Sequence, residues 1–437
     1  MRPLCAAQAC SIILSAILSV ILSALPLGVL SASPSQVDKT PDFAPFILDK
    51  RVEREDYNLR FGPVFVDIVG TFGIEYNDNI NTSEVDPISD FILQPGISLG
   101  FKWQMNENTE IDLNVGMEYW HYLTENDLNE FNNSFGLTPN TELSFRVMIG
   151  DVAFRVYDRL QYSFDSADSV VVDSVTGNVV DNDPEAFTRY RNVLGIQTEW
   201  FIRETAFSAQ LSREDVYSPE DIFSYVNRHE NKIALNAEHP LAANFLVGAG
   251  ASYSQIDFRE DVNNDGTIFT FGPYFDWKVT EVIGLYAGIA FNDWDYDEGA
   301  LTDSFGDKSN LQDYTWMVRL SHVANSVFNH QLEWYRAFNV SNTANFNIID
   351  GIRYTASYNL TPRIRLDGAI GYEESESSGG LLADDDFDRW IAGISTEVVL
   401  GPRLTAELGY RYIDKESDAT FQSYEQNQFR IFFKYDF

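Results

Sequence analysis

Apolar and polar residues alternate with a period of two along almost the whole chain from Val64 to the last residue. In residues 363–376, Ile364 and Leu366 fall on one face, and Arg365 and Asp367 fall on the other. A period of two indicates a β-strand, because successive side chains of a strand point to opposite faces. The pattern therefore predicts an all-β protein whose strands each have one apolar and one polar face.

The segments with this pattern number 18, and a count of 16 is the alternative. They are predicted at residues 64–76, 91–103, 109–122, 133–147, 152–164, 187–201, 205–217, 228–239, 244–258, 267–279, 283–296, 312–325, 328–340, 346–360, 363–376, 387–400, 403–414 and 425–437.

The connections between these segments alternate between short and long. Short turns are expected around residues 106–108, 149–151, 361–363 and 401–403, and longer polar stretches at 77–89, 165–186, 297–311, 377–386 and 416–424. Short turns at one rim and long loops at the other are typical of outer-membrane β-barrels. The sequence therefore predicts an antiparallel transmembrane β-barrel with short periplasmic turns and long, acidic extracellular loops.

Which face of a strand points outward can be tested by the free-energy cost of the opposite orientation. Turning residues 363–376 over would expose Arg365 to lipid, at a cost of roughly 2–4 kcal/mol for a basic group at the bilayer midplane. The polar faces must then line a lumen. A soluble sandwich is the competing fold, but 18 amphipathic strands exceed one sandwich. Asp158 is an exception, because it falls on the outward face of its strand.

The last nine residues form the clearest of the predicted strands. Its apolar face ends on an aromatic residue at the C-terminus and resembles the closing strand of a bacterial outer-membrane barrel. The resemblance implies a signal that the barrel-assembly machinery reads, carried by Phe429, Ile431, Phe433, Tyr435 and Phe437.

The start of the chain has a different character. Residues 11–30 form the one long apolar run, and the small residues Ser31, Ala32 and Ser33 follow it. This pattern predicts a signal peptide over residues 1–33; a retained membrane helix is the competing interpretation. A polar, proline-containing periplasmic leader is expected at residues 34–60, and the barrel at 61–437. Both cysteines, Cys5 and Cys10, lie in the predicted signal peptide, so no disulfide is expected in the mature protein.

Composition narrows the class further. A mean hydropathy of −0.21 excludes a bundle of membrane helices, but it suits a barrel in which half of each strand faces water. The formal net charge is −36, and so acidic a chain is not expected to bind nucleic acid.

Three stretches resemble the second β-barrel porin family, a family of bacterial outer-membrane barrels. They are FGPVFVDIVGTFGIEYNDNI at residues 61–80, NLTPRIRLDGAIGYE at 359–373 and LGPRLTAELGYRY at 400–412. The resemblance covers nearly the whole predicted barrel. It implies an outer-membrane channel, and in some members of the family an association with exopolysaccharide export. It supplies no catalytic residue.

Four arginines are candidate selectivity residues of the lumen. Arg155 and Arg159 face inward on one predicted strand, and Arg189 and Arg191 face inward on the next. Adjacent strands bring side chains of one face to about 5 Å apart. Two interpretations stay open: a constriction that guides anions or sugars, and a network of salt bridges that satisfies a polar interior.

A weaker candidate is a calcium site at Asp261, Asn263 and Asp265, which match the first half of an EF-hand loop. The twelfth position is Gly272 instead of the bidentate glutamate, and no helices flank the loop. The acidic long loops could also bind divalent cations, although acidic loops commonly serve solubility. No cofactor is expected.

The predicted function is a passive channel for small hydrophilic solutes in the bacterial outer membrane, with polysaccharide export as a possible specialisation. The expected partners are outer-membrane lipid and lipopolysaccharide, the barrel-assembly machinery and an exopolysaccharide export apparatus. A structural or adhesive barrel with a plugged lumen is the alternative. A lipid hydrolase using the outward His330 is a remote one, because the sequence lacks a recognisable catalytic motif, and no enzyme is predicted.

Overall fold

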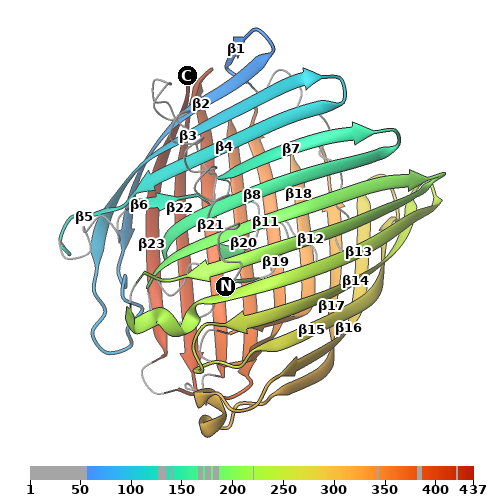
Figure 1. The fold of residues 1–437 in the computed structure, drawn as a ribbon. Coiled ribbons are helices and arrows are strands. Elements are labelled where there is room, and N and C mark those ends of the chain that lie inside the picture. The colour runs from blue at the N-terminus through green and yellow to red at the C-terminus, as the bar shows by residue number, and fades with distance from the viewer. Residues whose placement is uncertain are drawn as a thin grey trace, which may run out of the picture.

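The chain forms a closed barrel of 18 antiparallel strands (Figure 1). The computed structural model describes residues 57–125, 135–138, 141–165, 171–172, 179–180, 187–219, 221–341, 344–380, 386–419 and 422–437. Each strand pairs with its neighbours in sequence, and the last strand, β23 (Tyr424–Asp436), pairs with the first, β2 (Val64–Asn77). The predicted count of 18 is confirmed. The predicted signal peptide and nearly all of the leader lie outside the described residues.

The other wall strands follow in chain order. They are β3 (Asp90–Asn106), β4 (Thr109–Tyr119) with β5 (His121–Tyr122), β6 (Phe135–Leu137) with β7 (Glu142–Ile149), β8 (Val152–Asp165), β11 (Phe187–Ile202), β12 (Thr205–Tyr217), β13 (Arg228–Ala242), β14 (Phe245–Phe258), β15 (Gly266–Lys278), β16 (Ile283–Tyr296), β17 (Asn310–Val323), β18 (Phe328–Val340), β19 (Phe346–Thr361), β20 (Ile364–Ser377), β21 (Phe387–Gly401) and β22 (Leu404–Ser417).

Smaller elements complete the described structure. The strand β1 (Leu59–Phe61) pairs with β2 and overlaps the end of the predicted leader. A hairpin of β9 (Val171–Val172) and β10 (Val179–Val180) lies in the connection between β8 and β11. Two short 3₁₀ helices occur in loops, η3 (Asp221–Val226) and η4 (Leu301–Phe305). In the described part of the chain, no helix has the length and apolar character to cross a membrane.

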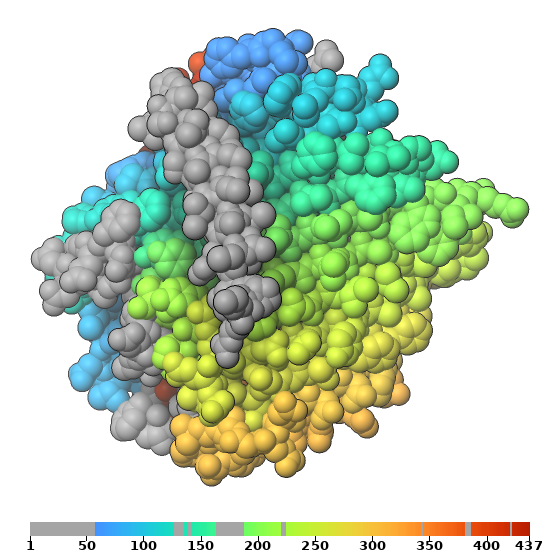
Figure 2. Space-filling view, in the orientation of Figure 1, coloured from blue at the N-terminus to red at the C-terminus, as the bar shows by residue number. Residues whose placement is uncertain are grey.

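The outer wall of the barrel is apolar, as the alternation predicts. Leu211, Leu235, Phe271 and Ile394 are each at least half exposed and lie on the outward face of their strands. Figure 2 shows this outer surface as parallel rows of side chains that follow the tilted strands. The alternate residues point inward, so the same period gives the barrel a polar interior.

The outward Asp158 has a partner. The Asn192 side-chain amide on β11 donates a hydrogen bond to its carboxylate, with an N···O distance of 2.6 Å. The same amide group also donates to the backbone carbonyl of Arg159. The exception to the alternation is therefore a polar contact between neighbouring strands.

The extracellular loops on one side of the barrel are hydrogen-bonded to one another. The buried Asn264 side chain donates to Asp303 and Asn345, which belong to two other loops. Asn345 in turn donates to the Lys308 carbonyl, and the Ser378 hydroxyl donates to Asp307. These contacts tie the loops that follow β14, β16, β18 and β20 into one unit, the loop cluster.

Candidate lining of the channel

The four predicted arginines all lie on the inner face of the barrel. Arg155 and Arg159 are on β8 and face Gln197 and Val193 of β11. Arg191 is two residues along β11 from Val193, so it is a diagonal neighbour of Arg159, which places their Cα atoms about 7–8 Å apart. The structure therefore brings the two pairs onto adjacent strands, staggered instead of directly opposed.

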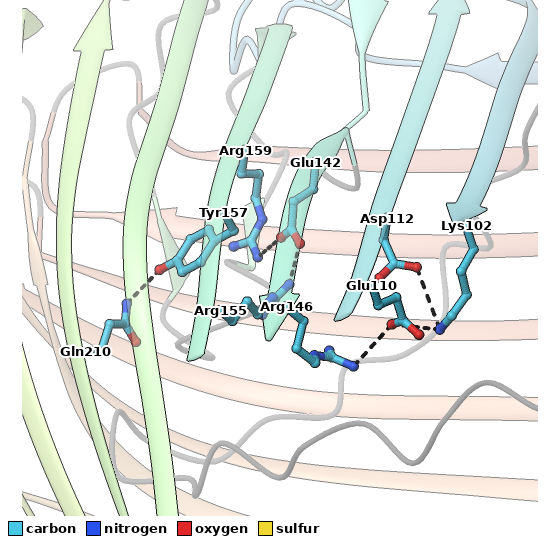
Figure 3. A network of polar contacts seen from close by, with 9 residues as sticks. All are labelled: Lys102, Glu110, Asp112, Glu142, Arg146, Arg155, Tyr157, Arg159 and Gln210. Carbon is cyan, nitrogen blue, oxygen red and sulfur yellow. Dashed lines mark hydrogen bonds and ion pairs between the residues drawn. The ribbon is translucent and has the colours of Figure 1, made fainter. Parts of the chain in front are cut away.

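Carboxylates on neighbouring strands neutralise three of these arginines. Glu142 of β7 binds the guanidinium of Arg155 with one oxygen and that of Arg159 with the other, the second at 2.6 Å (Figure 3). Arg191 binds Glu214 of β12 at 2.7 Å. These contacts support the salt-bridge interpretation for the three arginines.

A tyrosine fixes the position of the two β8 arginines. Tyr157 lies between them on the same face of the strand, and both guanidinium groups lie over its ring, with carbon-to-centroid distances of 5.1 Å and 5.5 Å. Its hydroxyl accepts a hydrogen bond from the Gln210 amide at 2.8 Å (Figure 3). Cation–π contacts of this kind favour the charged guanidinium groups beside the ring.

A second group of charges extends this lining to the neighbouring strands. Lys102 of β3 lies 2.9 Å from Glu110 and 3.7 Å from Asp112, both on β4. Arg146 of β7 approaches the same Glu110 at 3.5 Å (Figure 3). We call the combined set the charged wall, and its members are Lys102, Glu110, Asp112, Glu142, Arg146, Arg155 and Arg159.

The strands across the barrel carry another ion-paired group. Glu373 of β20 is almost completely buried and binds both Arg389 at 2.6 Å and Arg353 at 3.4 Å. It also accepts a hydrogen bond from the Tyr335 hydroxyl at 2.6 Å. A buried carboxylate with two guanidinium partners and a hydroxyl donor is well satisfied, so this group braces the wall.

The connection between β8 and β11 contains a hairpin that lies beside a distant strand of the wall. Its strand β10 lies against β18, whereas β8 and β11 are the fifth and sixth strands of the wall and β18 is the thirteenth. The described β9–β10 hairpin therefore lies far from the two strands that its connection joins, next to the thirteenth strand of the wall. Whether it narrows the passage could not be predicted from the sequence.

The closing strand has the orientation that the sequence predicts. Its five apolar residues are all outward and exposed, from 37% for Phe433 to 52% for Phe429. The backbone N–H of Phe437 donates to the Ile68 carbonyl of β2. The strand thus closes the barrel while it presents an apolar stripe to the membrane. Its reading by an assembly machinery stays a prediction.

The proposed calcium loop uses its polar groups internally. Asp265 accepts a hydrogen bond from the Phe258 N–H, and the Asn263 amide donates to the Tyr225 carbonyl. Among the described residues, no three histidine, cysteine or acidic side chains are grouped so that they could hold a metal ion. The calcium site stays a prediction without structural support. Much of the acidic loop sequence, including residues 181–186 and 381–385, lies outside the described residues.

His330 lies on the outward face near the periplasmic rim. Its Nε2 is 2.9 Å from Nδ1 of His322 on β17, and its ring stacks on Phe328. These contacts place it in a pair of imidazoles beside aromatic residues.

Several lining residues were not singled out from the sequence. Tyr157, Glu110, Asp112, Arg146 and Glu214 all follow the inward parity of their strands. Parity alone could have placed them in the lumen. The choice of partners could not be predicted, because it depends on the register between strands.

Comparisons with known proteins agree on the fold. No protein-family profile matches the chain, and no curated protein matches it in sequence. Among solved structures, it resembles OccK2 (OpdF) of Pseudomonas aeruginosa in complex with glucuronate, with a TM-score of 0.52 at 10% identity, covering 85% of this chain and 98% of the other.

OpdL of Pseudomonas aeruginosa gives a TM-score of 0.50 at 9% identity, over 86% of this chain and 99% of the other. OpdK with vanillate, from the same organism, gives 0.50 at 11% identity over 86% and 99%. Identities this low establish the fold alone. The closed 18-stranded barrel and its apolar outer surface place the protein in a bacterial outer membrane.

Proposed function

We propose that this protein is a passive channel for small hydrophilic solutes. The observation that supports this proposal is the charged wall: a continuous set of acidic and basic side chains, joined by ion pairs, on the inner face of a closed barrel. Ionised groups facing a dry interior would be costly, and an 18-stranded barrel has room for water inside. A water-containing passage accounts for both features.

The mixed charge of the wall suggests weak selectivity. Glu142, Glu110 and Asp112 oppose Lys102 and the arginines around them, so a passing ion meets both signs within a few ångströms. Small organic acids are nevertheless the first solutes to test, because two of the similar structures hold glucuronate and vanillate. Uncharged sugars of the same size are the matching comparison.

The test is conductance in planar bilayers together with swelling of liposomes that contain the purified barrel. A channel should give discrete ion-conducting steps and should admit an uncharged sugar and glucuronate at rates within about tenfold of each other, given screening over about 8–10 Å. A folded barrel that conducts no ions and admits neither solute would contradict the proposal and favour the structural or adhesive alternative.

The partners follow from the same proposal. The apolar stripe on β23 is suited to recognition by the barrel-assembly machinery, and the outer wall to lipid and lipopolysaccharide. Polysaccharide export has no observation in its favour among the described residues or the fold relatives, so the proposal extends only to small solutes.

A further inference from the structure

One seam of the barrel is incomplete at its extracellular end. The pairing of β17 with β18 ends at Trp316 and Arg336, although β17 continues back to Asn310 and β18 continues to Val340. Beyond that point β17 still pairs with β16, and β18 still pairs with β19. The two strands therefore part, and among the described strands neither edge joins a new β-ladder there, although β10 lies against β18.

The end of β18 and the start of β19 lie on the lumen side of the neighbouring wall strands. Lower on β18 the even-numbered residues face lipid, as the half-exposed Trp334 shows. Higher on the hairpin, the even-numbered Phe338 and Phe346 are almost completely buried and pack against Trp294. Trp294 belongs to the inward face of β16. The face that meets lipid below thus meets inward side chains above, so the hairpin end is folded into the barrel.

Aromatic contacts hold this infolded end, which comprises residues 337–340 and 346–349. The Trp294 ring makes edge contacts with Phe338 at 6.0 Å and with Phe346 at 6.2 Å between centroids. Ile256, Ile268 and Tyr296 complete the buried cluster. We call this cluster the aromatic latch.

Charged residues mark the point where the strands part. The Arg336 guanidinium binds Asp350 of β19 at 2.7 Å and reaches back to Asp313 of β17 at 3.0 Å. The Asp313 carboxylate also accepts a hydrogen bond from the N–H of Tyr314, on the unpaired stretch of β17. Arg336 thus bridges the two strands just below the gap.

The free edge of β17 fits the end of β18 in the existing register. Extending the pairs upward from Trp316 and Arg336 would place Tyr314 opposite Phe338 and Gln312 opposite Val340. All four are even-numbered, so Phe338 and Val340 would share the outward face with Tyr314, which is 52% exposed. The alternation along β18 therefore suits two arrangements: inside against the latch, or in the wall beside β17.

We propose that the infolded end, formed by the end of β18 and the start of β19, is a gate that exchanges between these two arrangements. In the closed arrangement it lies inside the extracellular mouth and is held by the aromatic latch and by the hydrogen bonds of Asn345 and Phe346 in the loop cluster. In the open arrangement residues 337–340 pair with residues 312–315 of β17 and leave the mouth wider. Opening exchanges buried aromatic contacts for the strand-to-strand hydrogen bonds that the parted edges lack, so each arrangement has a stabilising term that the other loses.

The test is disulfide trapping of the open pairing, in a chain with Cys5 and Cys10 replaced by serine. Gln312→Cys and Val340→Cys would be directly opposed if the ladder extended, with Cα atoms within the 4.4–6.8 Å that a disulfide requires. In the closed arrangement Gln312 is exposed and donates a hydrogen bond to the outward Asp293, whereas Val340 packs beside the latch on the lumen side. Val318→Cys with Trp334→Cys is the matched control, because those residues are paired already.

The control pair should cross-link rapidly and the 312–340 pair slowly. Adding Trp294→Ala should speed the second reaction by about tenfold or more, because it removes a large buried side chain from the closed arrangement. Heat-modifiable gel migration shows that each variant has folded. If the control pair cross-links completely while the 312–340 pair fails, with and without Trp294→Ala, the gate is excluded.

Conductance gives a second readout, which rests on the proposed channel function. The oxidised 312–340 variant should show larger conductance steps than the same protein after reduction, and the control pair should show no difference. Equal steps in the two states of a cross-linked 312–340 variant would overturn the role of the hairpin as a gate. If every variant cross-links as expected but none conducts ions, the proposed channel function is contradicted and the exchange between the two arrangements is not.

Discussion

At the scale of single residues, the lumen depends on how arginines and carboxylates are matched. Glu142 binds both Arg155 and Arg159. Removing one member of a partly buried ion pair leaves the other without compensation, so substitutions on the two sides of this group should shift the charge of the passage in opposite directions.

We expect Glu142→Gln to raise the anion-to-cation permeability ratio, because it releases two guanidinium groups toward the lumen. Arg159→Ser combined with Arg191→Ser should lower the ratio, because Glu142 and Glu214 then lose partners. Reversal potentials under a salt gradient measure both. Asp215→Asn, on the outward face, is the control. A ratio that stays at the wild-type value in both folded variants would mean that these groups do not face the conducting water.

A glycine on β11 makes room for Tyr157, the tyrosine between two arginines of the charged wall. A Cβ atom at Gly195 would lie 2.4 Å from Cζ of Tyr157, and the ring is held there by Arg155, Arg159 and Gln210. Gly195→Ala should therefore destabilise the barrel by roughly 1–3 kcal/mol, the usual cost of overpacking. Gly368→Ala, where the nearest atom is 3.9 Å away, is the control. Urea unfolding in detergent should separate the two, and equal midpoints would contradict the packing argument.

At the scale of elements, β23 has two tasks: it closes the barrel against β2 and carries an apolar stripe that ends at Phe437. The terminal residue adds one backbone hydrogen bond to Ile68, which any side chain would allow. The side chain itself should therefore matter for assembly more than for the finished barrel.

Phe437→Ala should reduce the amount of folded barrel in the outer membrane several-fold while leaving the unfolding midpoint of the purified barrel nearly unchanged. Phe437→Tyr, which keeps an aromatic ring, should assemble normally. Heat-modifiable migration of membrane fractions measures assembly. Normal assembly of Phe437→Ala would remove the terminal aromatic residue from the proposed signal.

The loop cluster should respond to pH through Asp307. Burial raises the pKa of this carboxyl above its ordinary value of 3.8, and the hydrogen bond from Ser378 only partly offsets that effect. A raised folded-state pKa means that the folded loops bind the proton more tightly than the unfolded ones. Their stability should therefore fall as the pH rises from about 3.8 through the raised pKa.

Limited proteolysis of the loops at pH 3.5 and pH 7.5, which lie on either side of the raised pKa, checks this dependence, with more protection expected at the lower pH. Asp307→Asn keeps the shape without the charge, so it should protect the loops at pH 7.5 and flatten the dependence. The pKa of Asp265 is also raised by burial. In the Asp307→Asn variant, this carboxyl should therefore leave a small remaining dependence of protection on pH. Protection that increases with pH in the wild-type protein would contradict the assignment.

At the scale of the whole molecule, the 18 strands form a barrel whose two ends differ. The periplasmic rim consists of short turns, and the extracellular end carries the loop cluster, the β9–β10 hairpin that lies against β18, and the infolded end of β18 with the start of β19. A passage through this barrel would therefore be narrowed from the extracellular side, by elements that the wall itself does not need for closure.

The sequence by itself determined the wall. Period-two alternation is a local property of an extended backbone, so residues such as Leu366 and Asp367 reveal their faces without knowledge of any neighbour. The same rule placed all four predicted arginines in the lumen and the stripe of β23 outside. Short and long connections then gave the order of the strands, because consecutive antiparallel strands pair.

Only the tertiary structure decided what the inward residues do. Glu142 meets Arg155 and Arg159 because the register of β7 with β8 sets which side chains are within reach, and one sequence does not give that register. The end of β18 shows the limit most clearly. Phe338 is apolar and can pack against either lipid or Trp294. The alternation along β18 therefore does not predict whether this residue lies in the wall or in the lumen. Competition between burial against the aromatic latch and pairing with β17 makes that choice, and both terms exist only once the barrel has formed.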